Sequence, residues 1–329
     1  MYRILVTGGA GYIGSHMVKL LVERGHAVCT LDDLSGGHRN AVLGGDFVQG
    51  SIGDGRLLDR LFQERRFDAV MHFASFIQVG ESVRDPAKYY ANNVANTITL
   101  LNAMARARIG AFVFSSSAAI FGDPEACPVA EDHPVKPLNP YGLSKWAVER
   151  MLGDYDHAYG MKSACLRYFN AAGAHPDGLL GERHEPESHL IPLVLQAASG
   201  RRPSIDVYGH DYPTPDGTCV RDYIHVVDLC DAHLLALDLL LSDRKSGAFN
   251  LGNGDGYSVQ QVLDVAGRVT GKRIKANHAS RRPGDAARLV ADSALARKQL
   301  GWQPRYAGLA QIISHAWAWE QKLASGAER

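Results

Sequence analysis

Two hydrophobic patterns alternate along the first 170 residues of the chain. Short runs of almost wholly apolar residues are typical of strands buried on both faces. Longer stretches with apolar residues three and four positions apart are typical of helices packed along one side. The runs that predict strands are residues 3–7, 27–32, 46–49, 69–73, 111–115 and 163–169. The stretches that predict helices are residues 12–25, 56–64, 84–108 and 141–159.

Regular alternation of this kind limits the possible folds. Parallel strands joined through helices need right-handed crossovers, and the helices then cover both faces of the sheet. The pattern therefore predicts an α/β protein built on a doubly wound parallel sheet.

The rhythm changes after Asn170. Residues 174–188 are rich in Gly, Pro, His and Glu without periodicity and predict a loop, and residues 201–221 are rich in Pro and Gly and predict mostly turns. Helices are predicted at 190–199, 226–241, 259–270 and 309–323, and a strand at 248–252. We therefore expect a first domain over residues 1–173 and a smaller, mixed α/β substrate domain over 174–329, with segments around 226–252 returning to the first.

Composition and charge narrow the function. The 329 residues carry 35 Lys plus Arg and 35 Asp plus Glu, and 46% are apolar. Such a chain can bury a large core, and its zero net charge argues against nucleic acid or an anionic membrane as a partner. The five cysteines are odd in number and lack C-x-x-C spacing, and the first apolar run is too short for a signal-peptide core. These features favour a cytoplasmic protein.

A glycine-rich turn follows the first predicted strand and opens the first predicted helix. Gly8, Gly11 and Gly14 have the spacing with which a tight turn, a close approach of phosphate to the backbone and close packing of helix on strand are achieved. In this strand-turn-helix context a dinucleotide-binding Rossmann fold is favoured over a simple turn. Asp32 ends the second predicted strand, where a carboxylate accepts hydrogen bonds from ribose hydroxyls and favours NAD over NADP. A cap for the next loop is the other interpretation of Asp32, and the nearby Arg39 keeps NADP open.

Tyr141 and Lys145 form a Y-x-x-x-K pair at the start of a predicted helix, with Asn139 as the expected N-cap. Residues four apart share a helical face, so the ammonium can lie beside the phenol and favour its ionised form as a base. Three hydroxyls end the fifth predicted strand at residues 115–117, where doubly wound sheets bind ligands. Either feature alone also occurs in proteins without this chemistry. The glycine turn, the serines and the Tyr/Lys pair together, in this order, indicate a hydroxyl-oxidising site.

The chain resembles the extended short-chain dehydrogenase/reductases and, within them, the UDP-hexose 4-epimerases. The resemblance covers nearly the whole chain, and its most specific stretches are Tyr212-Pro213-Thr214-x-Asp216-Gly217-Thr218, Val220-Arg221-Asp222-Tyr223-Ile224-His225-Val226 and Arg282-Pro283-Gly284-Asp285. It implies an isomerase that holds NAD and interconverts UDP-glucose and UDP-galactose through a transient 4-keto-hexose, with a homodimer as the expected assembly.

The resemblance also implies roles for individual residues. Tyr141 is the expected base, Lys145 holds the nicotinamide ribose and Ser117 orients the sugar hydroxyl. The residues implied to bind the cofactor are Gly8, Gly11, Tyr12, Ile13, Gly14, Asp32, Ser35, Ser51, Ile52, Phe73, Ala74, Asn92, Ser115, Tyr141, Lys145 and Phe169. The residues implied to bind the UDP-sugar are Ser117, Tyr141, Asn170, His189, Tyr208, Arg221, Arg282 and Asp285.

The chain departs from the family pattern at a few positions. Ser51 stands where an Asp is common and Ile77 where a Lys is common, and Leu289 leaves the preference for N-acetylated sugars open. Ala118 and Ala119 follow the strand-five hydroxyl where relatives that eliminate water or carbon dioxide have acidic residues. A UDP-N-acetylhexosamine or UDP-pentose 4-epimerase, and a dinucleotide-binding module without catalysis, are the alternatives.

Residues 182–189 contain two His and three Glu but no helical H-E-x-x-H, so a substrate flap without a metal is the preferred interpretation.

Overall fold

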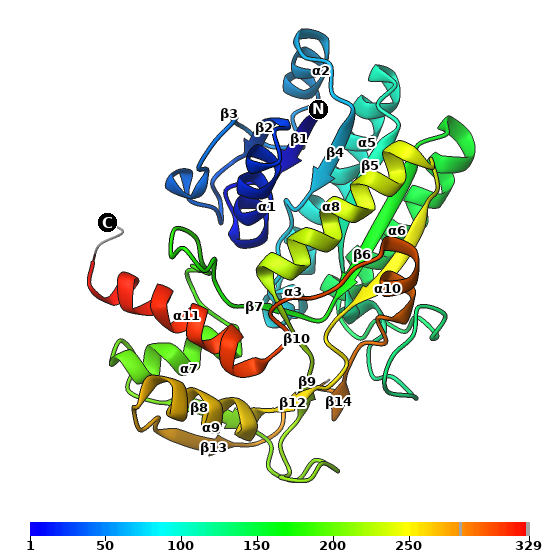
Figure 1. Cartoon of the computed structure of the whole chain (residues 1–329). Coiled ribbons are helices and arrows are strands. Elements are labelled where there is room, and N and C mark those ends of the chain that lie inside the picture. Colours follow the sequence, from blue (N-terminus) through cyan, green and yellow to red (C-terminus); the bar gives the residue numbers. More distant parts are fainter. Residues whose placement is uncertain (283–284, 327–329) are drawn as a thin grey trace.

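A computed structural model describes residues 1–282 and 285–326 of the chain (Figure 1). Its centre is a seven-stranded sheet in which every neighbouring pair is parallel. In spatial order the strands are β11 (Gly247–Leu251), β6 (Lys162–Tyr168), β5 (Ala111–Ser117), β4 (Ala69–His72), β1 (Arg3–Thr7), β2 (Ala27–Asp32) and β3 (Asp46–Gln49). The direction of winding reverses between β1 and β4, so the predicted doubly wound sheet is confirmed. A crevice opens at such a reversal, beyond the carboxyl ends of the strands.

The two faces of the sheet bury separate apolar cores. Ile4 and Val6 of β1 pack into one core and Leu5 into the other, because successive side chains of a strand point to opposite faces. The first core is covered by α1 (Tyr12–Glu23), α8 (Val226–Ser242) and α10 (Ala294–Leu300). The second is covered by α2 (Gly55–Glu64), α5 (Asn96–Ala107) and α6 (Pro140–Tyr159).

The helix predicted over residues 84–108 is present from Pro86 to Ala107, but it begins later than predicted and is not α-helical throughout. The segment is divided into α3 (Val79–Arg84), α4 (Pro86–Tyr89), a π-helical stretch (Tyr90–Ala95) and α5. The break lies at Asp85, whose side chain accepts a hydrogen bond from the N–H of Lys88 at 3.2 Å and so caps α4. A proline disfavours helical geometry at the preceding residue and is accepted at the first position of a helix, which explains the break before Pro86.

The remaining elements lie beyond the carboxyl ends of the strands (Figure 1). Three helices pack on one another around a third apolar core: α7 (Leu190–Ser199), α9 (Val259–Thr270) and α11 (Leu309–Ala324). Short strands complete this part in three small sheets: β7 (Asn170–Ala172) with β10 (Tyr223–His225), β8 (Ile205–Tyr208) with β13 (Ala276–Ala279), and β9 (Val220–Arg221) between β12 (Tyr257–Ser258) and β14 (Arg288–Leu289). Most of these short strands were not predicted. Between them the chain returns to the large sheet as α8 and β11.

Among the described helices, none is both long and apolar enough to cross a membrane.

Candidate active site

The glycine-rich turn between β1 and α1 leaves no room for side chains. A Cβ on Gly14 would lie 2.1 Å from the carbonyl oxygen of Gly8, and a Cβ on Gly8, where φ is +73°, would lie 2.4 Å from the amide nitrogen of Ala74. Gly11 is the N-cap of α1 and contributes no side-chain hydrogen bond, so the first N–H groups of the helix remain available to an anion. This bare backbone surface fits the pyrophosphate of a dinucleotide.

Asp32 ends β2 at the edge of the same crevice. One carboxylate oxygen accepts a hydrogen bond from the N–H of Ala10 at 2.9 Å and the other accepts from the N–H of Leu34 at 2.8 Å. Burial raises the pKa of this carboxyl group, and the two N–H donors act in the opposite direction. Each oxygen keeps a second lone pair, so the loop cap and a ribose-binding role are compatible.

The start of α6 places a tyrosine and a lysine one turn apart, as the sequence predicts. Asn139 caps the helix by accepting a hydrogen bond from the N–H of Gly142 at 2.9 Å, and Pro140 occupies the first turn. Tyr141 and Lys145 then share one face, and the Lys145 ammonium lies 5.8 Å from the centre of the Tyr141 ring. Ser117, at the end of β5, is hydrogen-bonded to the Tyr141 phenol. The three groups meet in one place although residues 117 and 141 come from different elements.

Lys145 is held almost without contact with solvent. It is 2% exposed, and its ammonium donates hydrogen bonds of 2.9 Å to the Ser75 hydroxyl and to the carbonyl oxygen of Ser115. Burial lowers the pKa of Lys145 to about 7. Burial also raises the pKa of Tyr141, against the smaller opposing effect of the Ser117 hydroxyl. The sequence-based expectation of a lowered pKa for Tyr141 is therefore not met by the protein alone, because desolvation outweighs the neighbouring groups.

The three serines at the end of β5 divide between the two faces of the sheet. Ser115 and Ser117 line the crevice, whereas the Ser116 hydroxyl donates to Glu149 on the other face. Glu149 in turn forms a buried ion pair of 2.6 Å with Arg167. The alternation of side chains along a strand thus selects two of the three hydroxyls for the site.

The opposite side of the crevice carries a fixed guanidinium. Arg221 of β9 donates to the carbonyl oxygens of Val220 and Ala286 at 2.9 and 2.8 Å, and its other nitrogen lies 3.4 Å from Asp285. Asn170 of β7 donates to the carbonyl oxygen of Asp222 at 2.8 Å. Arg221, Asp285 and Asn170 are therefore oriented before any ligand binds.

Asp222, the residue after Arg221, holds this side together. It is 1% exposed, and its carboxylate accepts hydrogen bonds from the N–H groups of Asn253 at 2.8 Å, Gly254 at 3.0 Å and Ala291 at 3.1 Å. The sequence resemblance included Asp222 in its motif without giving it a role, and these three bonds provide one.

These groups surround a cavity of about 690 Å³, within the range of small-molecule sites. It is lined by nearly all of the residues implied by the resemblance: Gly8, Gly11, Tyr12, Ile13, Gly14, Asp32, Ser35, Ser51, Ile52, Phe73, Ala74, Asn92, Ser115, Ser117, Tyr141, Lys145, Phe169, Asn170, His189, Arg221 and Asp285. Ile77, Ala118, Ala119 and Leu289 also line it.

Two implied substrate residues, Tyr208 and Arg282, do not line the cavity. They lie together instead, with the Arg282 guanidinium 3.8 Å from the centre of the Tyr208 ring. Pro283 and Gly284, which belong to the same motif, lie outside the described residues. The roles implied for Tyr208 and Arg282 stay predictions.

Sequence reasoning missed some of the residues around the cavity. Ser75 supports Lys145 but is separated from it by 70 positions, so no local pattern connects the two. Glu81 receives hydrogen bonds from Lys88 at 2.6 Å and from the Tyr89 phenol at 2.9 Å, and all three side chains line the cavity. The sequence-based predictions assign no role to Glu81.

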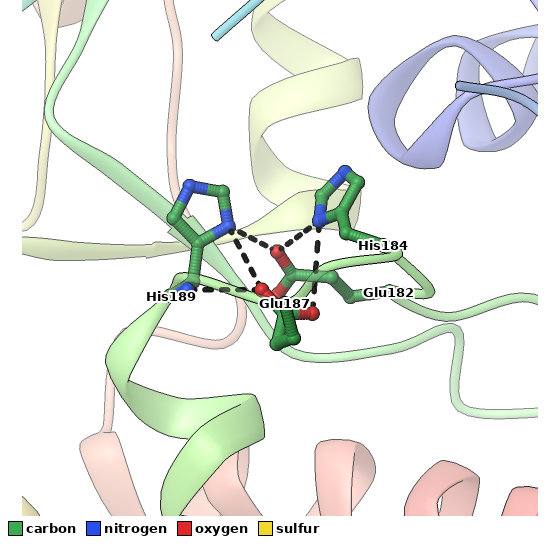
Figure 2. Close-up of side chains that lie close together, drawn as sticks. All are labelled: Glu182, His184, Glu187 and His189. Carbon is green, nitrogen blue, oxygen red and sulfur yellow. Dashed lines mark hydrogen bonds and ion pairs between the residues drawn. The ribbon is translucent and has the colours of Figure 1, made fainter. Parts of the chain in front are cut away.

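The loop before α7 brings four ionisable side chains close together (Figure 2). These are Glu182, His184, Glu187 and His189, here called the Glu182 cluster, and their donor atoms all lie within 4.8 Å of one another. His184 and His189 line the cavity.

Comparison with known proteins agrees with this arrangement. The model of the NAD dependent epimerase/dehydratase family matches residues 4–252. The UDP-glucose 4-epimerase of Halalkalibacterium halodurans is 51% identical over 323 residues, which are 98% of this chain and 97% of that one. The crystal structure of the Brucella ovis UDP-glucose 4-epimerase in complex with NAD superposes with a TM-score of 0.94 at 48% identity, covering 96% of this chain and 98% of that one. A second structure, the Stenotrophomonas maltophila UDP-glucose-4-epimerase with bound NAD and formylated UDP-arabinopyranose, gives a TM-score of 0.95 at 41% identity, covering 99% of this chain and all of that one.

Proposed function

This chain belongs to the NAD dependent epimerase/dehydratase family, and from that premise we propose that it is a UDP-glucose 4-epimerase. The observation that carries the proposal is the meeting of Ser117, Tyr141 and Lys145 in the cavity that also contains the glycine-rich turn. A dinucleotide site and a hydroxyl-oxidising group thus share one volume. NAD is the cofactor, and an epimerase needs no second substrate because the hydride taken from the sugar is returned to it.

Tyr141 acts as the base in this proposal. Its phenolate removes the proton of the 4-hydroxyl, and Ser117 holds that hydroxyl in line with the phenol. NAD, when bound in its oxidised form, supplies a hydride acceptor and a positive charge near the phenol. The sugar becomes a 4-keto-hexose and turns over. Carbon 4 then receives the hydride back on its opposite face while Tyr141 returns the proton to the 4-oxygen.

Lys145 serves the base rather than the sugar. Its ammonium is fixed by Ser75 and Ser115 and shares the Tyr141 face of α6. Because burial alone raises the pKa of Tyr141, the positive charges beside the phenol must offset that effect before the phenolate forms near neutral pH.

Arg221 and Asn170 bind the UDP part of the substrate in this proposal. A guanidinium held by two carbonyl oxygens presents its remaining N–H groups in a fixed orientation, which suits a diphosphate. His189 and Asp285 complete this side, and Arg282 and Tyr208 reach the nucleotide only if their loop moves toward the cavity.

The residues beside Ser117 favour epimerisation over elimination. Ala118 and Ala119 line the cavity where an acid or base would be needed to remove water or carbon dioxide. Proton and hydride exchange at carbon 4 requires only Tyr141, Lys145 and Ser117.

A panel of UDP-sugars tests the proposal. We expect the purified chain with NAD⁺ to equilibrate UDP-glucose and UDP-galactose, as followed by NMR of the product sugars, and to do so without added reductant. Conversion of UDP-N-acetylhexosamines or UDP-pentoses alone would replace the substrate and keep the mechanism; Leu289 at the cavity wall and the UDP-pentose bound to the Stenotrophomonas relative make that arm necessary. Tight NAD binding with no turnover of any sugar would favour a binding module instead.

Assembly and location belong to the same proposal. We infer a homodimer, because the helices near Tyr141 expose apolar side chains: Val83 of α3 is 62% exposed and Leu143 of α6 is 43% exposed. Light scattering should give twice the chain mass, and Val83→Glu should shift it toward the mass of one chain.

All five cysteines are free, which suits the reducing cytoplasm.

A further inference from the structure

The Glu182 cluster has the composition and the convergence of a metal site. Two imidazoles and two carboxylates come from one eight-residue stretch of the loop before α7, and Figure 2 shows all four side chains pointing toward a common centre. The imidazole nitrogens that face this centre are Nδ1 of His184 and Nδ1 of His189. Two nitrogen and two oxygen donors form a set that suits Zn²⁺.

The spacing of the donor atoms fits four-coordinate binding. Zn²⁺ binds His nitrogen and carboxylate oxygen at about 2.0–2.2 Å, which puts two tetrahedral ligands roughly 3.4 Å apart. Nδ1 of His184 lies 3.2 Å from Oε1 of Glu182 and 3.7 Å from Oε2 of Glu187, and Nδ1 of His189 lies 3.8 Å from the other oxygen of Glu187, Oε1. Glu182 and His189 are in direct hydrogen-bond contact, so the His189 side chain, 42% exposed, must move back for an ion to enter.

Burial makes the charge of the cluster hard to sustain without cations. The side chains of Glu182 and Glu187 are each 5% exposed, so two carboxylates face each other away from water. Such a pair needs two positive charges close by. The two imidazoles in protonated form supply both. One dication also supplies both, and it leaves the histidines neutral with lone pairs directed to the metal.

A buried ring nitrogen without a well-aligned hydrogen bond is a second observation at this site. Nδ1 of His184 is buried and makes no hydrogen bond with any residue in the described part of the chain, although two carboxylates lie within ion-pair distance. Its neighbours have poor hydrogen-bond geometry but acceptable metal-ligand separations. Such a nitrogen, set between two carboxylates, is a candidate metal ligand.

The surroundings hold the ligands in place. The indole N–H of Trp319 on α11 donates to the carbonyl oxygen of Glu182 at 2.9 Å, and the Glu187 carboxylate accepts the N–H groups of Ser188 at 2.7 Å and His189 at 2.9 Å. Outer contacts of this kind orient the ligands of metal sites. The exposed His189 and the adjoining cavity provide an entry path for the ion.

We propose that Glu182, His184, Glu187 and His189 bind one divalent transition-metal ion of the Zn²⁺ class. Four protein ligands close the coordination sphere, so the site is structural rather than catalytic. The ion cross-links the loop at the cavity wall, where the His184 ring lies 6.3 Å from the ring of Tyr12 in the dinucleotide turn. This inference replaces the metal-free flap expected from the sequence, and it leaves only Nε2 of His189 for the substrate contact proposed above.

Metal analysis of the full, tag-free chain tests the proposal. After dialysis against zinc and then against metal-free buffer, we expect about one equivalent of zinc per chain by mass spectrometry. Glu182→Gln and His184→Gln should weaken zinc binding roughly 100-fold in competition with a chelating dye, since each removes a direct ligand and even outer-shell changes cost about 10–100-fold. His157→Gln, at an exposed position of α6, is the matched control and should bind as the parent chain does. Zinc below a tenth of an equivalent, or equal affinity in the parent chain and both ligand variants, would overturn the proposal in favour of two imidazolium–carboxylate ion pairs.

A second measurement uses only the parent chain, so that misfolded variants cannot obscure the result. Co²⁺ in a four-coordinate site of nitrogen and oxygen ligands absorbs visible light much more strongly than hydrated Co²⁺. We expect such a band to saturate at one equivalent of Co²⁺ and to disappear on addition of Zn²⁺. A spectrum that stays that of the hydrated ion would reject the site.

Discussion

The cavity has two sides that are built in different ways. The sheet side, formed by the turn at residues 8–14, Asp32, Ser117, Tyr141 and Lys145, consists of strand ends and helix starts on the large parallel sheet. The loop side, formed by Asn170, the loop at residues 182–189, Arg221, Asp285 and Leu289, consists of loops and strands of two or three residues.

This difference places the proposed catalytic groups on the sheet side and the proposed substrate-binding groups on the loop side. On the sheet side, each functional group sits next to an extended element that fixes it, as α6 fixes Tyr141 and Lys145. On the loop side, orientation comes from single hydrogen bonds between residues far apart in the chain, as between Arg221 and Ala286. We therefore expect changes on the sheet side to act on kcat, and changes on the loop side to act on substrate affinity or on stability.

The largest effect should come from Tyr141→Phe. Loss of the phenolic oxygen removes the proposed base but keeps the ring in its buried place, so kcat should fall about 10³-fold, as for loss of a general base, while KM and NAD binding change little. Steady-state kinetics on UDP-galactose, with Tyr159→Phe at the exposed end of the same helix as control, provides the measurement. A kcat within tenfold of the parent value would mean that the sheet side does not carry the chemistry.

Asp222→Ala should have the next largest effect, on stability. It leaves the N–H groups of Asn253, Gly254 and Ala291 without their acceptor, the first two partly buried and the last buried, at a cost of roughly 2–4 kcal/mol in the free energy of unfolding. Chemical denaturation measures this loss. Asp206→Ala, at an exposed position of β8, should stay within about 0.5 kcal/mol of the parent chain. Equal stability of the two variants would show that the loop side is held by something other than Asp222.

Arg221→Met should act on binding. Losing a charged donor to the diphosphate should raise KM about 10- to 100-fold with little change in kcat, because the same contact is made before and during the reaction. Arg221→Lys should recover only part of the affinity, since an ammonium lacks the planar fork. The exposed Arg288 of β14 supplies the control variant Arg288→Met. A fall in kcat with unchanged KM would place Arg221 with the sheet side.

The same contrast decides what the sequence could predict. The strands of the large sheet, the glycine-rich turn and the start of α6 depend on neighbouring residues, and the pattern predicted them closely. Pro86 is a sequence signal for the break before it. The prediction passed over this signal because the apolar spacing on both sides is typical of a helix.

Most of the loop side could not be predicted in this way. Strands β9 and β14 are two residues long, too short for any periodicity, and form only because the chain returns to pair them. The contact of Lys145 with Ser75 and that of Arg221 with Asp285 join residues 70 and 64 positions apart, respectively. Resemblance supplied Arg221 and Asp285, and only the structure supplied Ser75.

The smallest expected effect is a change in the pH dependence of stability, and it tests whether the sheet side excludes water. His233 of α8 is fully buried behind the cavity, with its ring 5.0 Å from that of Phe73 and 5.9 Å from that of Tyr168, and burial lowers its pKa to about 4. In the unfolded chain the pKa of His233 returns to about 6.5. Between pH 6.5 and pH 4 the imidazole is therefore protonated in the unfolded state and neutral in the folded state. Its contribution to stability is therefore fully present above pH 6.5 and is lost as the pH falls toward 4, at about 1.4 kcal/mol per pH unit. His233→Leu should reduce the slope of unfolding free energy against pH by that amount between pH 6 and 4.5, whereas His157→Leu at an exposed position should leave it unchanged. If both variants keep the parent slope of unfolding free energy against pH, the ring of His233 contacts water, and the sheet side excludes water less well than its packing indicates.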